Sequence, residues 1–196
     1  MTSAGARRPT SRGVFAIEEE ELLLPDPIAL DTSFVVEALI ATQPLHVVCR
    51  VFLDQIDASG VSITTSDLLS VELAEAAFAI ALKERWGSSW RRHRTDGRAR
   101  RRAGRLLDDT VARYETVLAS KDHIPVPVGE VTNGARGFMT AYGLASCDAL
   151  HAASAVAAGA KAIVTIDTGF AFLPSTALLV YTDRSRVASC RNKRPH

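Results

Sequence analysis

Four acidic residues stand where secondary structure could carry them to one place. Asp31 directly follows the short apolar run 27–30, and Asp167 follows the apolar run 161–166. Asp148 lies in an alanine-rich stretch with helical spacing, and Glu72 lies in the second turn of another. Carboxylates that share one cleft cannot all stay ionised without a compensating charge, which hard divalent cations such as Mg²⁺ supply. Together these residues predict a site for a divalent cation.

Such a site would hydrolyse phosphodiester bonds without a protein nucleophile. Two divalent ions about 4 Å apart activate a water molecule and stabilise the leaving oxygen. The sequence contains no GxSxG, HExxH or Walker glycine motif and no Cys/His pairing of the zinc type. Alternatives remain for single residues: Asp31 could only cap a helix, and Glu72 could be a surface acid. His151 falls one turn after Asp148, and we interpret it as a packed helix histidine.

Strands and helices alternate along the chain. Apolar, β-branched runs predict strands at 27–30, 61–65, 161–166 and 176–182, and the segment 124–131 is extended because of its prolines. Helical periodicity covers 34–42, 46–56, 68–86, 106–120 and a stretch from near 131 to 158, with a possible break at Gly143. The alternation predicts an α/β fold, with a mainly parallel sheet between two helical layers. Ligands of such sheets bind at the carboxyl ends of the strands, where Asp31 and Asp167 stand.

An arginine-rich insertion at 85–105 interrupts this pattern. It holds nine arginines and one acid, a net charge of +8, which leaves −7 for the rest of a chain whose total is +1. Trp86, Trp90 and His93 are interleaved with the arginines. Basic clusters with aromatic residues suit phosphate contact and base stacking, and a solvated arginine loop is the alternative. We expect a mobile loop or the tip of a helical hairpin, with these residues in contact with nucleic acid: Arg91, Arg92, Arg94, Arg98, Arg100, Arg101 and Arg102.

Composition and length favour one globular domain. The 196 residues divide into an N-terminal extension at 1–26, which we expect to be mobile, a nuclease domain at 27–183 and a basic tail at 184–196. Three distant cysteines favour a reducing compartment. No apolar run reaches the ~20 residues of a membrane span, and the N-terminus lacks the apolar core of a signal peptide. We therefore expect a cytoplasmic protein without a membrane partner.

The acidic residues and their surroundings resemble the PIN-domain family, most closely the VapC-type toxin ribonucleases of toxin–antitoxin pairs. The resemblance covers about 27–181 and rests on four motifs in order: Asp31-Thr32-Ser33 after the first strand, Glu72 in an S-x5-E-L pattern, YGLASCDALHAASA and TIDTGF. Single motifs of this kind are weak, but their order and their strand and helix contexts are specific.

The resemblance implies a three-layer α/β/α sandwich and an endoribonuclease that depends on Mg²⁺ or Mn²⁺. It implies Asp31, Glu72, Asp148 and Asp167 as catalytic and metal-binding residues, with Ser33 and Thr165 as hydroxyls that orient ligands or water. It also implies RNA as substrate, a cognate antitoxin and a homodimer. The extension and the arginine-rich insertion are extra to the family pattern. Two alternatives therefore stay open: an RNA-processing or decay nuclease without an antitoxin, and a non-catalytic RNA-binding module.

Overall fold

A single parallel sheet organises the protein. The computed structural model describes residues 13–19 and 22–193, and within these ranges six strands pair in the order β1-β6-β5-β2-β3-β4. All neighbouring strands run parallel. The strands are β1 (Val14–Ala16), β2 (Ile28–Leu30), β3 (Ile63–Ser66), β4 (His123–Val126), β5 (Ala162–Val164) and β6 (Leu179–Thr182). The helices are α1 (Thr32–Leu39), α2 (His46–Ala58), α3 (Leu68–Trp86), α4 (Gly97–Ala119), α5 (Val128–Tyr142), α6 (Ser146–Ala157) and α7 (Arg184–Lys193), with 3₁₀ helices η1 (Gly87–His93) and η2 (Thr168–Phe172).

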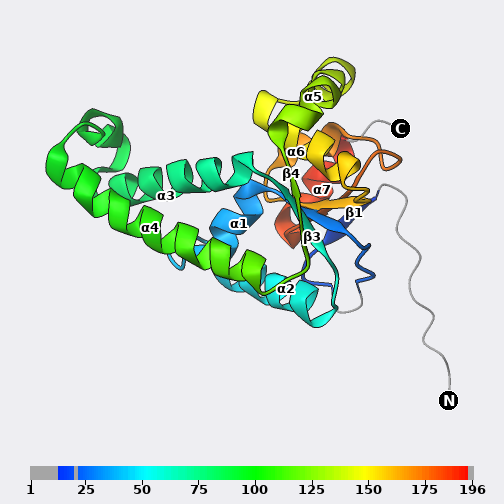
Figure 1. Ribbon diagram of the computed structural model, residues 1–196, viewed down its shortest axis with the longest axis horizontal. Helices are drawn as coiled ribbons and strands as arrows, with labels where there is room; N and C mark the ends of the chain where they lie inside the picture. Colours follow the sequence, from blue (N-terminus) through cyan, green and yellow to red (C-terminus); the bar gives the residue numbers. More distant parts are fainter. Residues whose placement is uncertain (1–12, 20–21, 194–196) are drawn as a thin grey trace.

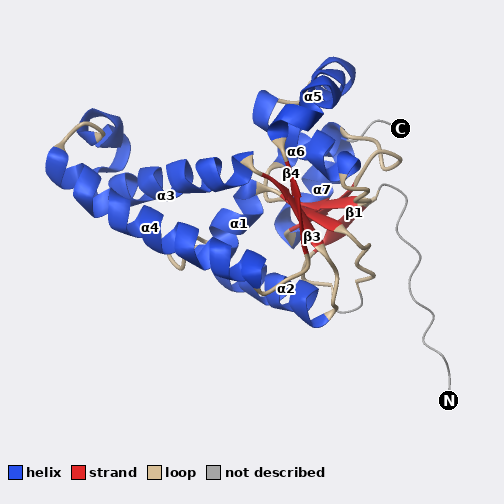
Figure 2. Ribbon diagram, in the orientation of Figure 1, coloured by secondary structure: helices blue, strands red, loops and turns tan. Residues whose placement is uncertain are grey.

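Helices cover both faces of the sheet (Figures 1 and 2). Successive residues of β2 point to opposite faces, so Ile28 and Leu30 join one core while Ala29 joins the other. The first core is shared with α1, α2, α3 and α4, and the second with α5, α6, η2 and α7. The prediction of a three-layer α/β/α sandwich is confirmed.

The strand order reverses between β2 and β5. The chain proceeds from β2 through β3 to the β4 edge, then returns to place β5 on the other side of β2. Leu30 at the end of β2 pairs with Val164 at the end of β5. A crevice forms at such a switch point, outside the carboxyl ends of the two strands. Asp31 and Asp167 therefore follow neighbouring strands at this place.

Helices α3 and α4 form an antiparallel arm that extends beyond the sheet (Figure 1). Of the two expectations for the arginine-rich insertion, the helical hairpin tip is the one observed: η1 and the first turns of α4 close the arm. A small apolar core of its own stabilises the tip, formed by Ala79, Ala81, Leu82, Trp90, Ala99 and Ala103. Asp96 caps α4 by accepting hydrogen bonds from the N–H groups of Arg98 and Ala99.

The N-terminal segment and the C-terminal tail differ from their predictions. β1 pairs with β6, and Phe15 stacks on Tyr181 with ring centroids 5.1 Å apart, so part of the predicted extension at 1–26 belongs to the sheet. Residues 1–12 lie outside the described residues. Residues 184–193 of the predicted tail form α7, which buries Val187 and Cys190 against the sheet. A three-residue strand and a helix with two buried apolar residues leave too little periodicity in the sequence to be recognised.

Two other elements differ in their bounds from the prediction. The segment predicted as extended at 124–131 forms the shorter strand β4, which ends at Val126. β4 is an edge strand of the described sheet, where a proline is tolerated because one side of the strand pairs with no other described strand. The helix expected from near residue 131 starts at Val128, directly after Pro127. It is separated from α6 at Gly143, whose φ of +68° is left-handed. Within the described residues, no helix is both long enough and apolar enough to cross a membrane.

Candidate functional site

Asp31 and Asp167 each close a strand and open a helical turn. Asp31 follows β2 and caps α1, with Oδ2 accepting a hydrogen bond from the N–H of Ser33 at 3.3 Å. Asp167 follows β5 and caps η2, with Oδ1 accepting from the N–H of Gly169 at 2.7 Å. Each cap occupies one carboxylate oxygen, so capping leaves the second oxygen of each residue for another ligand.

Two hydroxyl groups hold Asp31 in place. The hydroxyls of Thr165 (2.8 Å) and Ser33 (2.5 Å) both donate to its Oδ2. The Ser33 hydroxyl also accepts from the N–H of Ile166, and the Thr165 hydroxyl accepts from the N–H of Asp167, both at 2.9 Å. These hydrogen bonds tie the carboxylate after β2 to the backbone after β5, so they fix the spacing of the two strand ends.

Asp148 reaches the same rim from the first turn of α6. A Cβ atom added at Gly169 would lie 3.0 Å from Asp148 Oδ2 and 3.3 Å from Asp167 Oδ1. The two carboxylates therefore flank the same point, and the absence of a side chain at Gly169 leaves the space between them open.

The charge of this cluster is not balanced by its own residues. Burial, followed by repulsion from Asp167 and Asp31, raises the pKa of Asp148 from 3.8 to about 6. Glu72 contributes to the rise, and His151 opposes it. No side chain or backbone group in the described ranges donates a hydrogen bond to Asp148. A cation beside Asp148 would be stabilised by this arrangement.

Glu72 is held apart by a buried histidine. His151, 3% exposed, lies on α6 and places Nε2 2.6 Å from Glu72 Oε2 and 3.9 Å from Asp31 Oδ1. Its Nδ1 lies 3.2 Å from the hydroxyl of Ser66 at the end of β3. The hydroxyl of Thr32 donates to the same Glu72 oxygen at 2.5 Å. The imidazole thus connects β3, α3 and α6.

These contacts make Glu72 and His151 an ion pair. Burial alone would raise the pKa of Glu72, but hydrogen bonds to the carboxylate, chiefly from His151, outweigh burial and lower the pKa to about 2. Burial alone would lower the pKa of His151, but the hydrogen bond to Glu72 and the charge of Asp31 outweigh burial and raise that pKa. The hydrogen bond from His151 therefore favours the ionised form of Glu72.

The residues on this rim match the chemistry of a hard divalent cation. The candidate ligands are carboxylate oxygens, which Mg²⁺ and Mn²⁺ prefer, and His151 offsets only part of the effect of burial and of Asp167 and Asp31 on the pKa of Asp148. Within the described residues, no three His, Cys, Asp or Glu side chains are gathered closely enough to enclose an ion.

Three of the four predicted acids thus lie along one rim without closing around a single point, and Glu72 is linked to Asp31 through His151. His151 is buried, as we interpreted it, and it also reaches the site, which its position one turn after Asp148 allows. The sequence signal lies in its position three residues after Asp148, on the same helical face. Cys147 hydrogen-bonds Glu72, which raises the pKa of its thiol to about 11, and the sequence gives no indication of this contact.

The predicted RNA-contacting arginines lie at the far end of the arm. All seven are exposed: Arg91, Arg92, Arg94, Arg98, Arg100, Arg101 and Arg102. Arg94 forms a bidentate ion pair with Glu75, at 2.6 Å for each contact. Among the described residues, the other arginines of the 85–105 insertion form no ion pair. Fourteen residues of α3 follow Glu72 before the tip begins, which is about 21 Å at 1.5 Å per residue.

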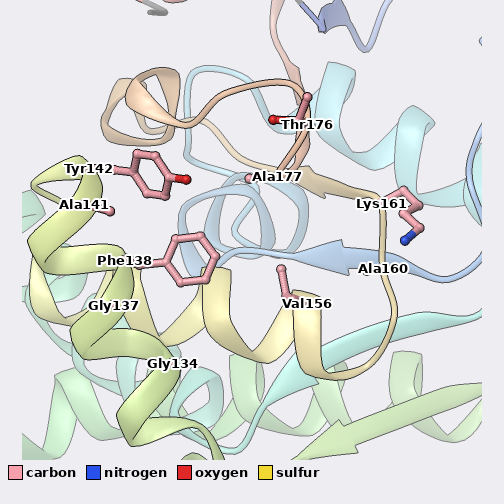
Figure 3. Close-up of a pocket in the computed structure, with 10 residues that line it drawn as sticks. All are labelled: Gly134, Gly137, Phe138, Ala141, Tyr142, Val156, Ala160, Lys161, Thr176 and Ala177. Atoms are coloured by element: carbon pink, nitrogen blue, oxygen red, sulfur yellow. The ribbon is translucent and has the colours of Figure 1, made fainter.

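A separate cavity of about 450 Å³ lies between α5 and α6 (Figure 3). Phe138 and Tyr142 of α5 face Val156 near the end of α6, and Lys161 precedes β5. Asp148 lies at the other end of α6, so this cavity is not part of the carboxylate rim.

Comparison with known proteins agrees with this architecture. The PIN domain model matches residues 28–174, and the chain therefore belongs to the PIN domain family. No curated protein matches the sequence. One similar solved structure is FitAcB from Neisseria gonorrhoeae, with 22% sequence identity, a TM-score of 0.45 and coverage of 79% of this chain and 96% of that chain.

Proposed function

We propose that this PIN-domain protein is a metal-dependent endoribonuclease. The observation that carries the proposal is the placement of Asp148 Oδ2 and Asp167 Oδ1 beside the same point at Gly169, after the end of β5. The raised pKa of Asp148 agrees with this concentration of negative charge, which a cation would balance. The rim lies at the switch point of a parallel sheet, where ligands of this architecture bind.

The proposal gives each side chain a role. Asp31, Asp148 and Asp167 hold Mg²⁺ or Mn²⁺, and Glu72 completes the site. When bound, the metal supplies an activated water and stabilises the leaving oxygen of the phosphodiester. Ser33 and Thr165 keep Asp31 in register with the end of β5, as their hydrogen bonds indicate.

The exposed arginines of the arm bind RNA away from the bond that is cut. The insertion carries a net charge of +8, and Arg91 stacks over the ring of Trp90 at 4.8 Å. Contacts between arginines and phosphates carry no sequence preference, and they position the RNA strand. Because Arg94 is paired with Glu75, it contributes more to the shape of the tip than to RNA contact.

Replacing Asp31 with Asn tests the activity. Purified protein should cleave RNA in the presence of Mn²⁺ and lose activity with EDTA. Asp31→Asn should lower the cleavage rate by at least about a hundredfold. The loss of a residue that only supports a ligand costs about ten- to a hundredfold, and this variant changes the ligand itself. Asp54→Asn, an exposed residue on α2, is the control and should leave the rate unchanged. Intact metal-dependent cleavage in Asp31→Asn would overturn the assignment, and a preference for single-stranded DNA would overturn the RNA substrate.

We further propose that the protein is the toxin of a toxin–antitoxin pair that acts in the cytoplasm as a homodimer. The proposal is supported by the likeness of the acidic motifs to VapC-type toxins. Expression of the protein should arrest growth, expression of Asp31→Asn should not, and a small protein encoded beside it should restore growth. Normal growth under full expression would favour an RNA-processing nuclease without an antitoxin. A monomer in analytical ultracentrifugation would contradict the dimer.

A further inference from the structure

The ion pair of His151 with Glu72 is the feature of the site that the proposed activity does not explain. The His151 side chain is 2% exposed and the Glu72 side chain 22% exposed, so most of this pair is removed from water. A buried imidazole of this kind is held in one orientation by hydrogen bonds to both of its nitrogens. Ser66 is the partner of Nδ1, and Nε2 lies 2.6 Å from Glu72 Oε2 and 3.2 Å from the hydroxyl of Thr32.

The direction of the hydrogen bond to Glu72 does not depend on the charge of the ring. A carboxylate oxygen only accepts, so Nε2 of His151 must donate to it. The Ser66 hydroxyl can accept from Nδ1 or donate to it, so this partner suits either state of the ring. The hydrogen bond between His151 and Glu72 therefore exists whether the ring is neutral or charged.

The same carboxylate oxygen, Glu72 Oε2, receives a second hydrogen bond from Thr32. Thr32 lies in the first turn of α1, directly after Asp31. Two donors from two helices thus fix Glu72 from opposite ends of the chain. For this oxygen to bind a metal ion directly, it would have to give up contacts that are already made in the folded protein.

We propose that His151 is a positioning residue that keeps Glu72 out of direct contact with the metal. Asp31, Asp148 and Asp167 are then the direct ligands, and Glu72 acts on the metal through a water molecule. The inference rests on the proposed function and assigns different parts to its four acids.

Two neutral variants separate positioning from charge. His151→Gln and His151→Leu both remove the ring and any charge on it, but Gln keeps an N–H donor for Glu72 and Leu does not. Calorimetric titration with Mn²⁺ should show about tenfold tighter binding to His151→Leu than to His151→Gln, because the freed Glu72 becomes a ligand. RNA cleavage should be slower in His151→Leu in spite of the tighter binding. A purely structural defect would weaken binding and cleavage together.

Adding Glu72→Gln to both variants checks that the effect passes through Glu72. The difference in Mn²⁺ affinity should then disappear, since a double-mutant cycle isolates the interaction of the pair. Thr32→Val removes the second donor at a nearly identical volume and should also tighten Mn²⁺ binding. This variant keeps the inference testable if His151→Leu does not fold.

Equal Mn²⁺ affinity of His151→Leu and His151→Gln would overturn the inference. The inference would also be overturned if the single variant Glu72→Gln weakened Mn²⁺ binding as much as the single variant Asp148→Asn, because Glu72 would then be a direct ligand. Neither result touches the proposed activity. In contrast, a wild-type protein that binds no Mn²⁺ and cuts no RNA would overturn the proposed function itself.

Discussion

Asp31 shows how one carboxylate serves structure and chemistry at once. Its Oδ2 caps α1 and accepts the hydroxyls of Ser33 and Thr165, while Oδ1 faces the imidazole of His151 at 3.9 Å. The capping role, which is the ordinary role of an aspartate before a helix, is real here. It orients the carboxylate and therefore assists the second role.

The pKa shift of Asp148 predicts that the stability of the metal-free protein depends on pH. Because the folded-state pKa of about 6 lies above the ordinary 3.8, the metal-free protein becomes less stable as the pH rises through this window. Asp148→Asn removes this cost. At pH 7.5 in EDTA, urea unfolding should show that the variant is more stable than wild type by about 1 kcal/mol. This figure is smaller than the full conversion of the pKa shift, because solvent screens a half-exposed carboxylate.

The advantage of Asp148→Asn should fade as the pH falls from 6 toward 4, because the folded wild-type carboxyl becomes protonated, and it should vanish below the ordinary pKa of 3.8, where the carboxyl is protonated in both states. Mn²⁺ should reverse the order, because it stabilises only the protein that binds it. A variant less stable than wild type at pH 7.5 in EDTA would contradict the electrostatic account.

Gly169 offers a second test at the residue scale. An alanine there would place its Cβ 3.0 Å from Asp148 Oδ2, so the carboxylate must move. Gly169→Ala should weaken Mn²⁺ binding about tenfold with little change in metal-free stability, as expected when the support of a ligand is lost. Gly137→Ala on α5 is the matched control, since its Cβ would meet nothing within 4 Å. Unchanged affinity in Gly169→Ala would place the metal away from Asp148.

The arm formed by α3 and α4 is the element that separates binding from cleavage. Its inner end carries Glu72, and its outer end carries the arginines. Ala99 and Ala103 let α4 approach α3 closely, and Trp90 fills the space at the tip. The charge changes sign along α4, because Asp108 and Asp109 follow the arginines. The positive surface is thereby confined to the outer half of the arm.

Replacing Arg98, Arg100, Arg101 and Arg102 with Gln should weaken RNA binding and flatten its salt dependence. Each lost phosphate contact lowers the slope of log affinity against log salt by about 0.7 to 0.9. Filter binding at several salt concentrations measures the slope, and Arg136→Gln on α5 is the control. Cleavage of an RNA too short to span the distance to the tip should be unaffected. A slope equal to that of wild type would leave the tip as a solvated surface.

At the scale of the whole molecule, the sheet extends beyond the segment matched by the family model. β1 pairs with β6 outside residues 28–174, and α7 packs on β1 and η2. The Tyr181 hydroxyl donates to the carbonyl of Leu23 at 2.8 Å, which ties the chain before β2 to the core. The N-terminal segment is in this respect part of the domain.

Removal of residues 1–26 should therefore destabilise the fold. It exposes β6 and takes away Val14, Ala16 and Ile17, which are at most 3% exposed. At about 1.5 to 3 kcal/mol for a large buried side chain, the loss is a sizeable part of the 5–15 kcal/mol that stabilises a typical protein. Thermal unfolding should show a broad or missing transition. Removal of 1–12 alone keeps every described contact and is the control; equal melting temperatures for both truncations would contradict this role of β1.

The sequence by itself determined the α/β class, the two acids at strand ends and the helical stretches, because these depend on local periodicity. Asp31 and Asp167 could be placed on one rim from strand direction alone. The motif order that led to the PIN domain family is also local information, and the match of the family model agrees with it.

Only the tertiary structure decided what depends on contacts between distant segments. The pairing of His151 with Glu72 joins residues 79 positions apart, and β1 is a strand only because β6 lies beside it. Gly169 owes its importance to the carboxylate of Asp148, which approaches it from another helix. Side chains acquire these partners when the chain folds, since burial demands a hydrogen-bond partner for every polar group but does not name it in the sequence.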